Sequence, residues 1–141
     1  MLKNMPAILS PDLIHVLMSM GHGDEIVLAD GNFPAESNAE RLIRADGHGV
    51  CDLLQAMISF FPIDESMNDY AIVMDTGDAS SPHIWSKFET ILQNNNSDRS
   101  ILTSISREHF YDRSRDAFAI VATSESALFA NLILKKGVVI L

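Results

Sequence analysis

The chain has 141 residues, of which 47% are hydrophobic, and a formal net charge of −9. This length suits one domain with a substantial core. The acidic balance argues against a nucleic-acid binder, because such proteins need clustered Lys and Arg and the 10 basic residues here are scattered along the chain. A single cysteine excludes an intrachain disulfide framework, no apolar run reaches membrane length and no signal-peptide pattern opens the chain, so we expect one cytoplasmic domain over residues 1–141.

The first half of the chain predicts two helices with a strand between them. Ser10 and Pro11 form an N-cap and first-turn pair, and apolar residues then recur at helical spacing until Gly21 ends the helix. Residues 26–29 form a continuous apolar run, which predicts a short strand covered on both faces. A second amphipathic helix covers residues 50–61 and ends at the proline that follows.

The second half alternates in the same way. Residues 71–74 predict a strand, and the apolar spacing over 82–93 predicts a helix, which a polar loop over 94–97 follows. Ser106 is the predicted N-cap of a further short helix. The last two predicted strands cover 118–123 and 132–134. In outline the order is α-β-α-β-α-β-α-β-β, which predicts a three-layer α/β/α domain around a mainly parallel sheet.

A histidine stands between two glycines where the first predicted helix ends, in the segment MGHGDEIVLAD at 20–30. Glycine allows a sharp turn and close approach of a ligand, and the ordinary histidine pKa of about 6.5 suits proton transfer near neutrality. His22 is therefore a candidate catalytic residue, although a solvent-facing turn after a C-capping Gly21 has the same pattern. Asp30 directly follows the apolar run, at the carboxyl end of a strand, where α/β sheets place ligands. It could equally cap the turn that follows it.

Four further segments, taken together with this one, make the chain similar to the family of ribose pyranases and fucose mutarotases. They are GNFPA at 31–35, IRADG at 43–47, AFAIV at 117–121 and LKKGV at 134–138. The likeness runs nearly end to end and is closer to the fucose branch, in which MGHGDEI and IRADG are typical. It implies a cofactor-free isomerase that interconverts the anomers of a free monosaccharide, with L-fucose as the first choice.

Mutarotation makes modest chemical demands. Opening a cyclic hemiacetal requires a proton on the ring oxygen and loss of the anomeric hydroxyl proton, which one histidine and one further acid–base group can provide. We assign His22 as the general acid toward the ring oxygen, and Asp30 either fixes a sugar hydroxyl or orients His22 through a hydrogen bond. No metal or nucleotide is needed, and His22, Asp24 and Glu25 do not share a face that would hold a metal ion.

The resemblance places the rest of the sugar site in the last third of the chain. Arg107 falls on a basic sugar-binding position, and Phe129, Ala130 and Asn131 fall on the family's Tyr-(Gly or Ala)-Asn segment. A guanidinium and an amide can bind several hydroxyl oxygens, while an aromatic face packs on the C–H side of a sugar. Phe129 lacks the hydroxyl of the usual tyrosine, which leaves the choice of sugar open. Tyr111 could supply that hydroxyl, or it could be a partly buried helix aromatic.

The high hydrophobic content beside this net charge predicts that subunits cover apolar surface on one another. The resemblance implies a homodecamer of two stacked rings of five, with each site completed by a neighbouring subunit. Two alternatives remain open: a non-catalytic sugar-binding protein that uses the same pocket, and a ribose-type pyranase for a different monosaccharide. Only an enzyme requires His22 to exchange protons.

Overall fold

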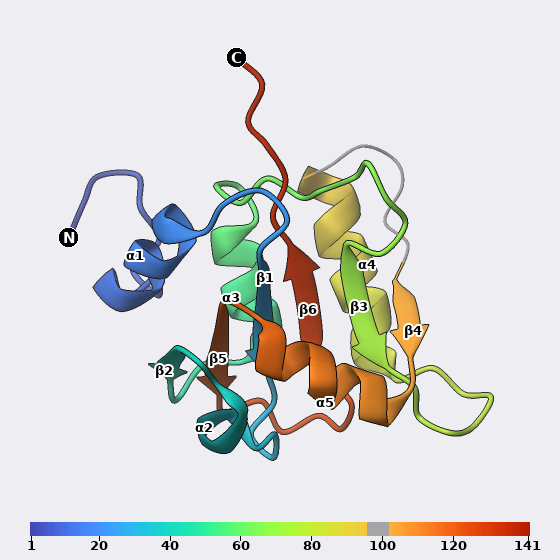
Figure 1. Ribbon diagram of the computed structural model, residues 1–141. Coiled ribbons are helices and arrows are strands. Elements are labelled where there is room, and N and C mark those ends of the chain that lie inside the picture. The colour runs from blue at the N-terminus through green and yellow to red at the C-terminus, as the bar shows by residue number, and fades with distance from the viewer. Residues whose placement is uncertain (96–101) are drawn as a thin grey trace.

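The structure is a computed structural model that describes residues 1–95 and 102–141. At its centre is a six-stranded sheet in the order β2-β5-β1-β6-β3-β4 (Figure 1). The helices are α1 (Pro11–Ser19), α2 (Ala35–Asn38), α3 (Val50–Met57), α4 (His83–Asn95) and α5 (Arg107–Asp116). The strands are β1 (Glu25–Ala29), β2 (Leu42–Ala45), β3 (Ala71–Met74), β4 (Thr103–Ile105), β5 (Ala119–Thr123) and β6 (Leu132–Lys135). Within the two described stretches, every helix is too short or too polar to span a bilayer.

Strand β6 runs against all of its neighbours in the sheet. It lies between β1 and β3 and pairs antiparallel with both, whereas β1 with β5, β2 with β5, and β3 with β4 are parallel. The sheet therefore has two distinct edges. The carboxyl edge carries the ends of β1 to β5 and the start of β6, and the amino edge carries the starts of β1 to β5 and the end of β6 (Figure 1).

Helices cover both faces of the sheet, with α3 and α4 behind it and α5 in front in Figure 1. Along β1, Ile26 and Leu28 join the core beneath α1, α3 and α4, while Val27 and Ala29 join the core beneath α2 and α5. All four side chains are fully buried, as the continuous apolar run predicts. The predicted three-layer α/β/α class with a mainly parallel sheet is confirmed.

The predicted outline lacks α2 and β2. Each has four residues, and each has one buried side chain, Ala35 in α2 and Ile43 in β2. Because β2 lies at the edge of the sheet, it shows neither a continuous apolar run nor a clean alternation. Strand β4 takes the place of the strand that the outline puts between the third and fourth predicted helices.

The predicted caps are confirmed, and two predicted boundaries are wrong. The hydroxyls of Ser10 and Ser106 accept hydrogen bonds from backbone amides in the first turns of α1 and α5. The helix predicted over 50–61 ends earlier, at Met57, and a turn over 58–60 follows it. The loop predicted over 94–97 is helical at 94 and 95, where Asn95 Nδ2 donates to a carbonyl of its own helix. Positions 96 and 97 lie outside the described residues.

Candidate active site

Asp30 and Asn131 face each other at the carboxyl edge of the sheet, where β1 ends and β6 begins. The Asp30 amide donates to Asn131 Oδ1 at 2.7 Å, and Asn131 Nδ2 donates to Asp30 Oδ2 at 3.0 Å. The amide of Asn32 donates to the other carboxylate oxygen of Asp30 at 3.0 Å, so Asp30 also caps the turn that follows it. Both residues are buried, and their mutual hydrogen bonds hold them in place without a ligand.

A cavity of about 160 Å³ opens beside this pair. Its lining includes five residues that the sequence analysis proposes for sugar binding: Asp30, Arg107, Tyr111, Phe129 and Asn131. Ligand pockets usually have volumes of roughly 300–1,000 Å³. The cavity of one chain is therefore a small, partial pocket in which carboxylate, amide and guanidinium groups converge.

One wall of the cavity is an aromatic stack that ends in a cation. Tyr111 stacks on Phe33 with ring centroids 5.3 Å apart and an interplanar angle of 15°. The guanidinium carbon of Arg107 lies 5.7 Å from the centroid of the Tyr111 ring. Arg107 is the first residue of α5 and is exposed, so its donors remain accessible to a polar ligand.

The backbone at Phe129 has an unusual conformation, with φ at +56°. A bulky residue in this left-handed region costs of order 1–3 kcal/mol, and such outliers cluster at ligand sites. The carbonyl of Phe129 accepts a hydrogen bond from Trp85 Nε1 of α4 at 2.8 Å, which holds the turn in place. The Phe129 side chain is half-buried against the cavity, whereas Ala130 is fully buried in the core on the opposite face of the sheet.

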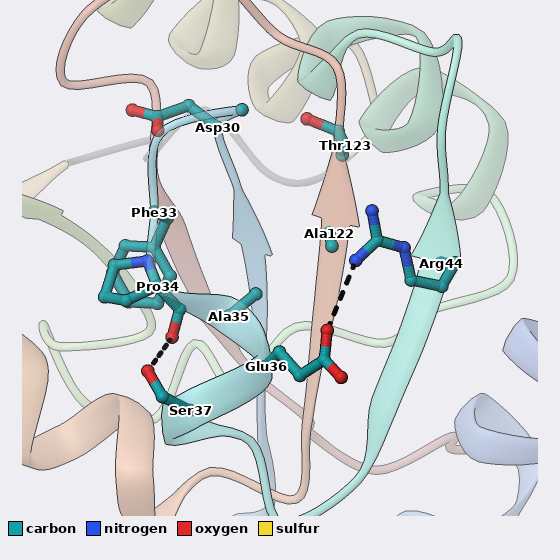
Figure 2. Close-up of a pocket in the computed structure, with 10 residues that line it drawn as sticks. Asp30, Phe33, Pro34, Ala35, Glu36, Ser37, Arg44, Ala122 and Thr123 are labelled. Atoms are coloured by element: carbon teal, nitrogen blue, oxygen red, sulfur yellow. Dashed lines mark hydrogen bonds and ion pairs between the residues drawn. The ribbon is translucent and has the colours of Figure 1, made fainter.

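A second hollow, of about 410 Å³, lies on the other side of Asp30 against α2 (Figure 2). Its cation, Arg44 of the IRADG segment, is 2.7 Å from Asp46 and 3.9 Å from Glu36. The hydrogen bond from Arg44 lowers the pKa of Asp46. Because this guanidinium already has carboxylate partners, the Arg107 cavity is the better candidate for a sugar site.

His22 lies at the opposite, amino edge of the sheet, in the tight turn between α1 and β1. The Gly21 amide donates to the Asp24 carboxylate at 2.7 Å, and the Asp24 amide donates to the Gly21 carbonyl at 3.2 Å. Of the two flanking glycines, only Gly23 adopts a positive φ, at +86°, so only Gly23 requires the conformational freedom of glycine. The His22 side chain is 59% exposed and reaches outward from this turn.

Asp64 is the partner of His22 and was missed by the sequence analysis. Its Oδ2 lies 3.3 Å from His22 Nε2, and its side chain is only 10% exposed. Hydrogen bonds from Ser66 lower the pKa of Asp64, and the hydrogen bond from His22 acts in the same direction. The sequence signal that could have found it is Asp64 two residues before Ser66, shortly after the helix predicted over 50–61. This spacing is typical of an Asx turn.

The structure therefore divides the predicted site residues into two groups, and it places Ala130 in neither of them, because that side chain is buried in the core. His22 with Asp64 lies at the amino edge, and the cavity with Asp30 lies at the carboxyl edge. From Glu25 to Ala29, β1 makes four steps of roughly 3.3 Å and so separates the two groups by about 13 Å. This distance is far beyond hydrogen-bond reach. The alternative that Asp30 orients His22 is thus wrong within one chain, because Asp64 makes that contact. Among the described residues, no group of three or more His, Cys, Asp or Glu side chains could hold a metal ion.

Known proteins match this chain over nearly its whole length. The sequence model of the RbsD / FucU transport protein family matches residues 3–139. The Homo sapiens protein named fucose mutarotase is 45% identical, over 99% of this chain and 96% of the human protein. The Actinobacillus pleuropneumoniae protein (serotype 5b, strain L20) named L-fucose mutarotase is 39% identical, over 98% of this chain and 97% of its own length.

The fold is also similar to that of a solved relative. A crystal structure of the fucose mutarotase from Streptococcus pneumoniae in complex with L-fucose matches with a TM-score of 0.92 and 45% sequence identity. The match covers 99% of this chain and 100% of that one.

Proposed function

Because the chain belongs to the RbsD / FucU transport protein family, as its motifs indicate, we propose that it is a fucose mutarotase, an isomerase that interconverts the anomers of free L-fucose. The observation that carries the proposal is the exposed imidazole of His22. A carboxylate that is itself nearly buried holds one ring nitrogen and leaves the other open to a substrate. This is the arrangement that general acid–base catalysis on a small ligand needs.

We propose that the two groups of site residues meet between subunits, with His22 and Asp64 of one copy facing the Arg107 cavity of the next. Three features support this assembly. The two groups lie at opposite edges of one sheet, the cavity is smaller than an ordinary ligand pocket, and each group is flanked by exposed apolar side chains. Leu128 is 68% exposed at the rim of the cavity, and residues 138–141, which follow the amino edge, are all exposed.

A contact between opposite edges of two copies is head-to-tail, and such contacts form a ring when the rotation from one copy to the next closes. The family resemblance suggests two stacked rings of five, and we propose that decamer here. In each ring every subunit contributes one half of each of two sites, so the number of complete sites equals the number of subunits. Sedimentation of the intact protein far above the mass of one chain is the immediate expectation.

Within the shared site, His22 is the general acid and base. The ionised carboxylate of Asp64 accepts a hydrogen bond from Nε2, so Nδ1 is the ring nitrogen that meets the sugar. The protonated imidazole gives its Nδ1 proton to the ring oxygen as the bond from that oxygen to the anomeric carbon breaks. After the aldehyde rotates, the same nitrogen takes the proton back as the C5 hydroxyl closes on the other face. Each such transfer contributes about 10²- to 10⁴-fold.

The residues of the neighbouring cavity hold the sugar and complete the proton balance. Among the described residues that line it, Asp30 is the one carboxylate, and we assign it the anomeric hydroxyl, whose proton it accepts and later returns. The hydrogen bonds from Asn131 and Asn32 fix that carboxylate in position. Arg107 and the aromatic wall then bind the other hydroxyls and the apolar side of the ring.

We also propose that the protein acts in the cytoplasm. Its one cysteine, Cys51, is a free thiol, as is usual for proteins of reducing compartments. Burial raises the pKa of this thiol, so it stays protonated and unreactive at neutral pH.

Exchange NMR on a panel of free sugars tests the proposed activity. With the protein at catalytic concentration, we expect the α and β signals of L-fucose to exchange magnetisation much faster than in buffer alone, and faster than those of D-galactose and D-ribose. Acceleration of D-ribose alone would instead favour a ribose-type pyranase. Binding of a sugar without faster exchange would favour a non-catalytic sugar-binding protein.

Phe129→Tyr is expected to change the preference among these sugars. The added hydroxyl would lie at the cavity wall, where a new hydrogen bond to a sugar oxygen contributes about 0.5–1.5 kcal/mol, a several-fold change in relative exchange rate. The measurement compares exchange of L-fucose, D-galactose and D-ribose in the parent and variant. Phe129→Ala serves as the packing control, and identical rates and ranking in all three proteins would place Phe129 outside the sugar site.

A further inference from the structure

We infer that Lys136 and Gly137, which directly follow β6, are positioning residues that set where His22 and Asp64 stand relative to each other. The inference rests on the proposed function for its activity readout. These residues belong to the LKKGV segment, which is part of the family resemblance but takes no part in the chemistry proposed above. In the structure they lie between the turn that carries His22 and the loop that carries Asp64.

The contacts of Lys136 hold the His22 turn from both its sides. Its Nζ donates to the carbonyls of Leu17 and Met20, at 2.8 and 2.6 Å, where α1 ends just before His22. The backbone of Lys136 binds the other side of the turn. Its carbonyl accepts a hydrogen bond from the Gly23 amide, and its amide donates one to the Asp24 carbonyl, each at 2.8 Å. Residues on both sides of His22 are thus bound to one lysine.

The backbone of Gly137 and of Lys135 holds the Asp64 loop. The Gly137 amide donates to the Pro62 carbonyl at 2.7 Å, and the Asp64 amide donates to the Lys135 carbonyl at 3.0 Å. A Cβ at Gly137 would lie 2.5 Å from the carbonyl oxygen of Ile63 and 2.9 Å from the Asp64 amide nitrogen. The backbone of this loop therefore packs against Gly137 so closely that any side chain there would push it away.

This arrangement matters because the side chains of His22 and Asp64 are joined directly by a single hydrogen bond. His22 and Asp64 are 42 positions apart and meet through one hydrogen bond of 3.3 Å between a mostly exposed ring and a carboxylate. The Lys136 ammonium also satisfies carbonyls at the C-terminus of α1, whose partial negative charge favours a cation there. Loss of that ammonium frees the end of α1 and, with it, the start of the His22 turn.

The test replaces Lys136 by Met, which keeps the aliphatic stem and removes the three donors. Lys135→Met is the matched control. Lys135 is the adjacent lysine of the same strand end, but its Nζ is bound to Asp69 at 3.2 Å. A misplacement of about 1 Å can cost on the order of 10² in rate. For Lys136→Met we expect kcat for fucose anomer exchange to fall about tenfold or more with KM within about twofold, whereas Lys135→Met keeps both values.

Two further variants separate positioning from general damage to the fold. Lys136→Arg retains a cation with several donors and is expected to restore most of the lost kcat. Gly137→Ala acts on the other loop and is expected to lower kcat in the same way. Equal losses for Lys136→Met and Lys135→Met, or an unchanged kcat for Lys136→Met, would overturn the inference.

A second readout does not depend on activity. The imidazole signals of His22 in proton–carbon NMR spectra, identified by their absence in His22→Gln, report the position of the ring directly. We expect Lys136→Met and Gly137→Ala to shift these signals and Lys135→Met to leave them in place. If the parent protein exchanges no sugar, the proposed function fails while these shifts still decide the positioning role. Unmoved signals in both variants would refute that role even in an active enzyme.

Discussion

Replacing His22 by Gln is expected to slow the exchange of fucose anomers by about 10²-fold or more while sugar binding stays within roughly tenfold of the parent value. Glutamine can still donate a hydrogen bond to Asp64, but it cannot transfer a proton at neutral pH. The loss therefore falls on the transition state and leaves the ground-state contacts in place. The measurement is exchange NMR and sugar titration on the same samples.

The exposed His15 on α1 provides a matched control for this prediction. His15→Gln makes the same chemical change on a surface helix and is expected to leave exchange at the parent rate. Unchanged exchange in His22→Gln would remove His22 from the mechanism. A parallel loss of sugar binding would instead show that the imidazole acts mainly as a binding group.

Two impaired variants are expected to gain activity when their subunits are mixed. His22→Gln disables the imidazole half of every site, and Arg107→Ala removes a charged hydrogen-bonding group worth about 1.5–3 kcal/mol, a loss of roughly 10- to 10²-fold in kcat/KM. If each site joins the two halves from different chains, random co-assembly pairs an intact His22 with an intact Arg107 at about one quarter of the sites. Exchange NMR on the co-expressed variants should recover about that share of parent activity.

A matched mixture separates this result from simple stabilisation. Co-assembly of His22→Gln with the double variant His22→Gln/Arg107→Ala supplies no intact imidazole and should stay inactive. Mass measurement of both mixtures must show mixed assemblies of equal size. Full activity in a separated single chain, or no recovery in mixed assemblies, would contradict a site shared between subunits.

The parts of the fold that could be predicted from the sequence are those buried on both faces or marked by a cap. Residues 26–29 of β1 and all of β3 are continuous apolar runs, and Ser10 and Ser106 mark helix starts by the side-chain oxygen that they offer to free amides. β2 was missed because it is a short edge strand in which Arg44 is exposed and one of four side chains is buried, so its sequence has no recognisable apolar pattern. The apolar pattern of a strand depends on how many of its side chains are buried, and an edge strand buries few.

Five of the predicted binding residues line one cavity, but the sequence analysis did not name Asp64 and did not place His22 at the other edge of the sheet. Asp30, Arg107 and Asn131 converge on one cavity, as their resemblance to a sugar-binding set implies. The separation of His22 was nevertheless present in the chain order, since His22 precedes and Asp30 follows the same strand. Asp64 stayed hidden because its partner is distant in sequence and no periodic pattern links a turn to a loop.

The reversed central strand also bears on how the chain reaches this structure. β6 is formed by residues 132–135, yet it pairs with β1, whose residues come more than a hundred positions earlier. Until residues 132–135 are in place, β1 and β3 each lack a partner in the middle of the sheet and leave one backbone edge unpaired. Non-local pairing of this kind is slow and prone to aggregation. The sheet therefore closes only when β6 is inserted between β1 and β3, and a deletion that removes residues 132–135 leaves it open at its centre.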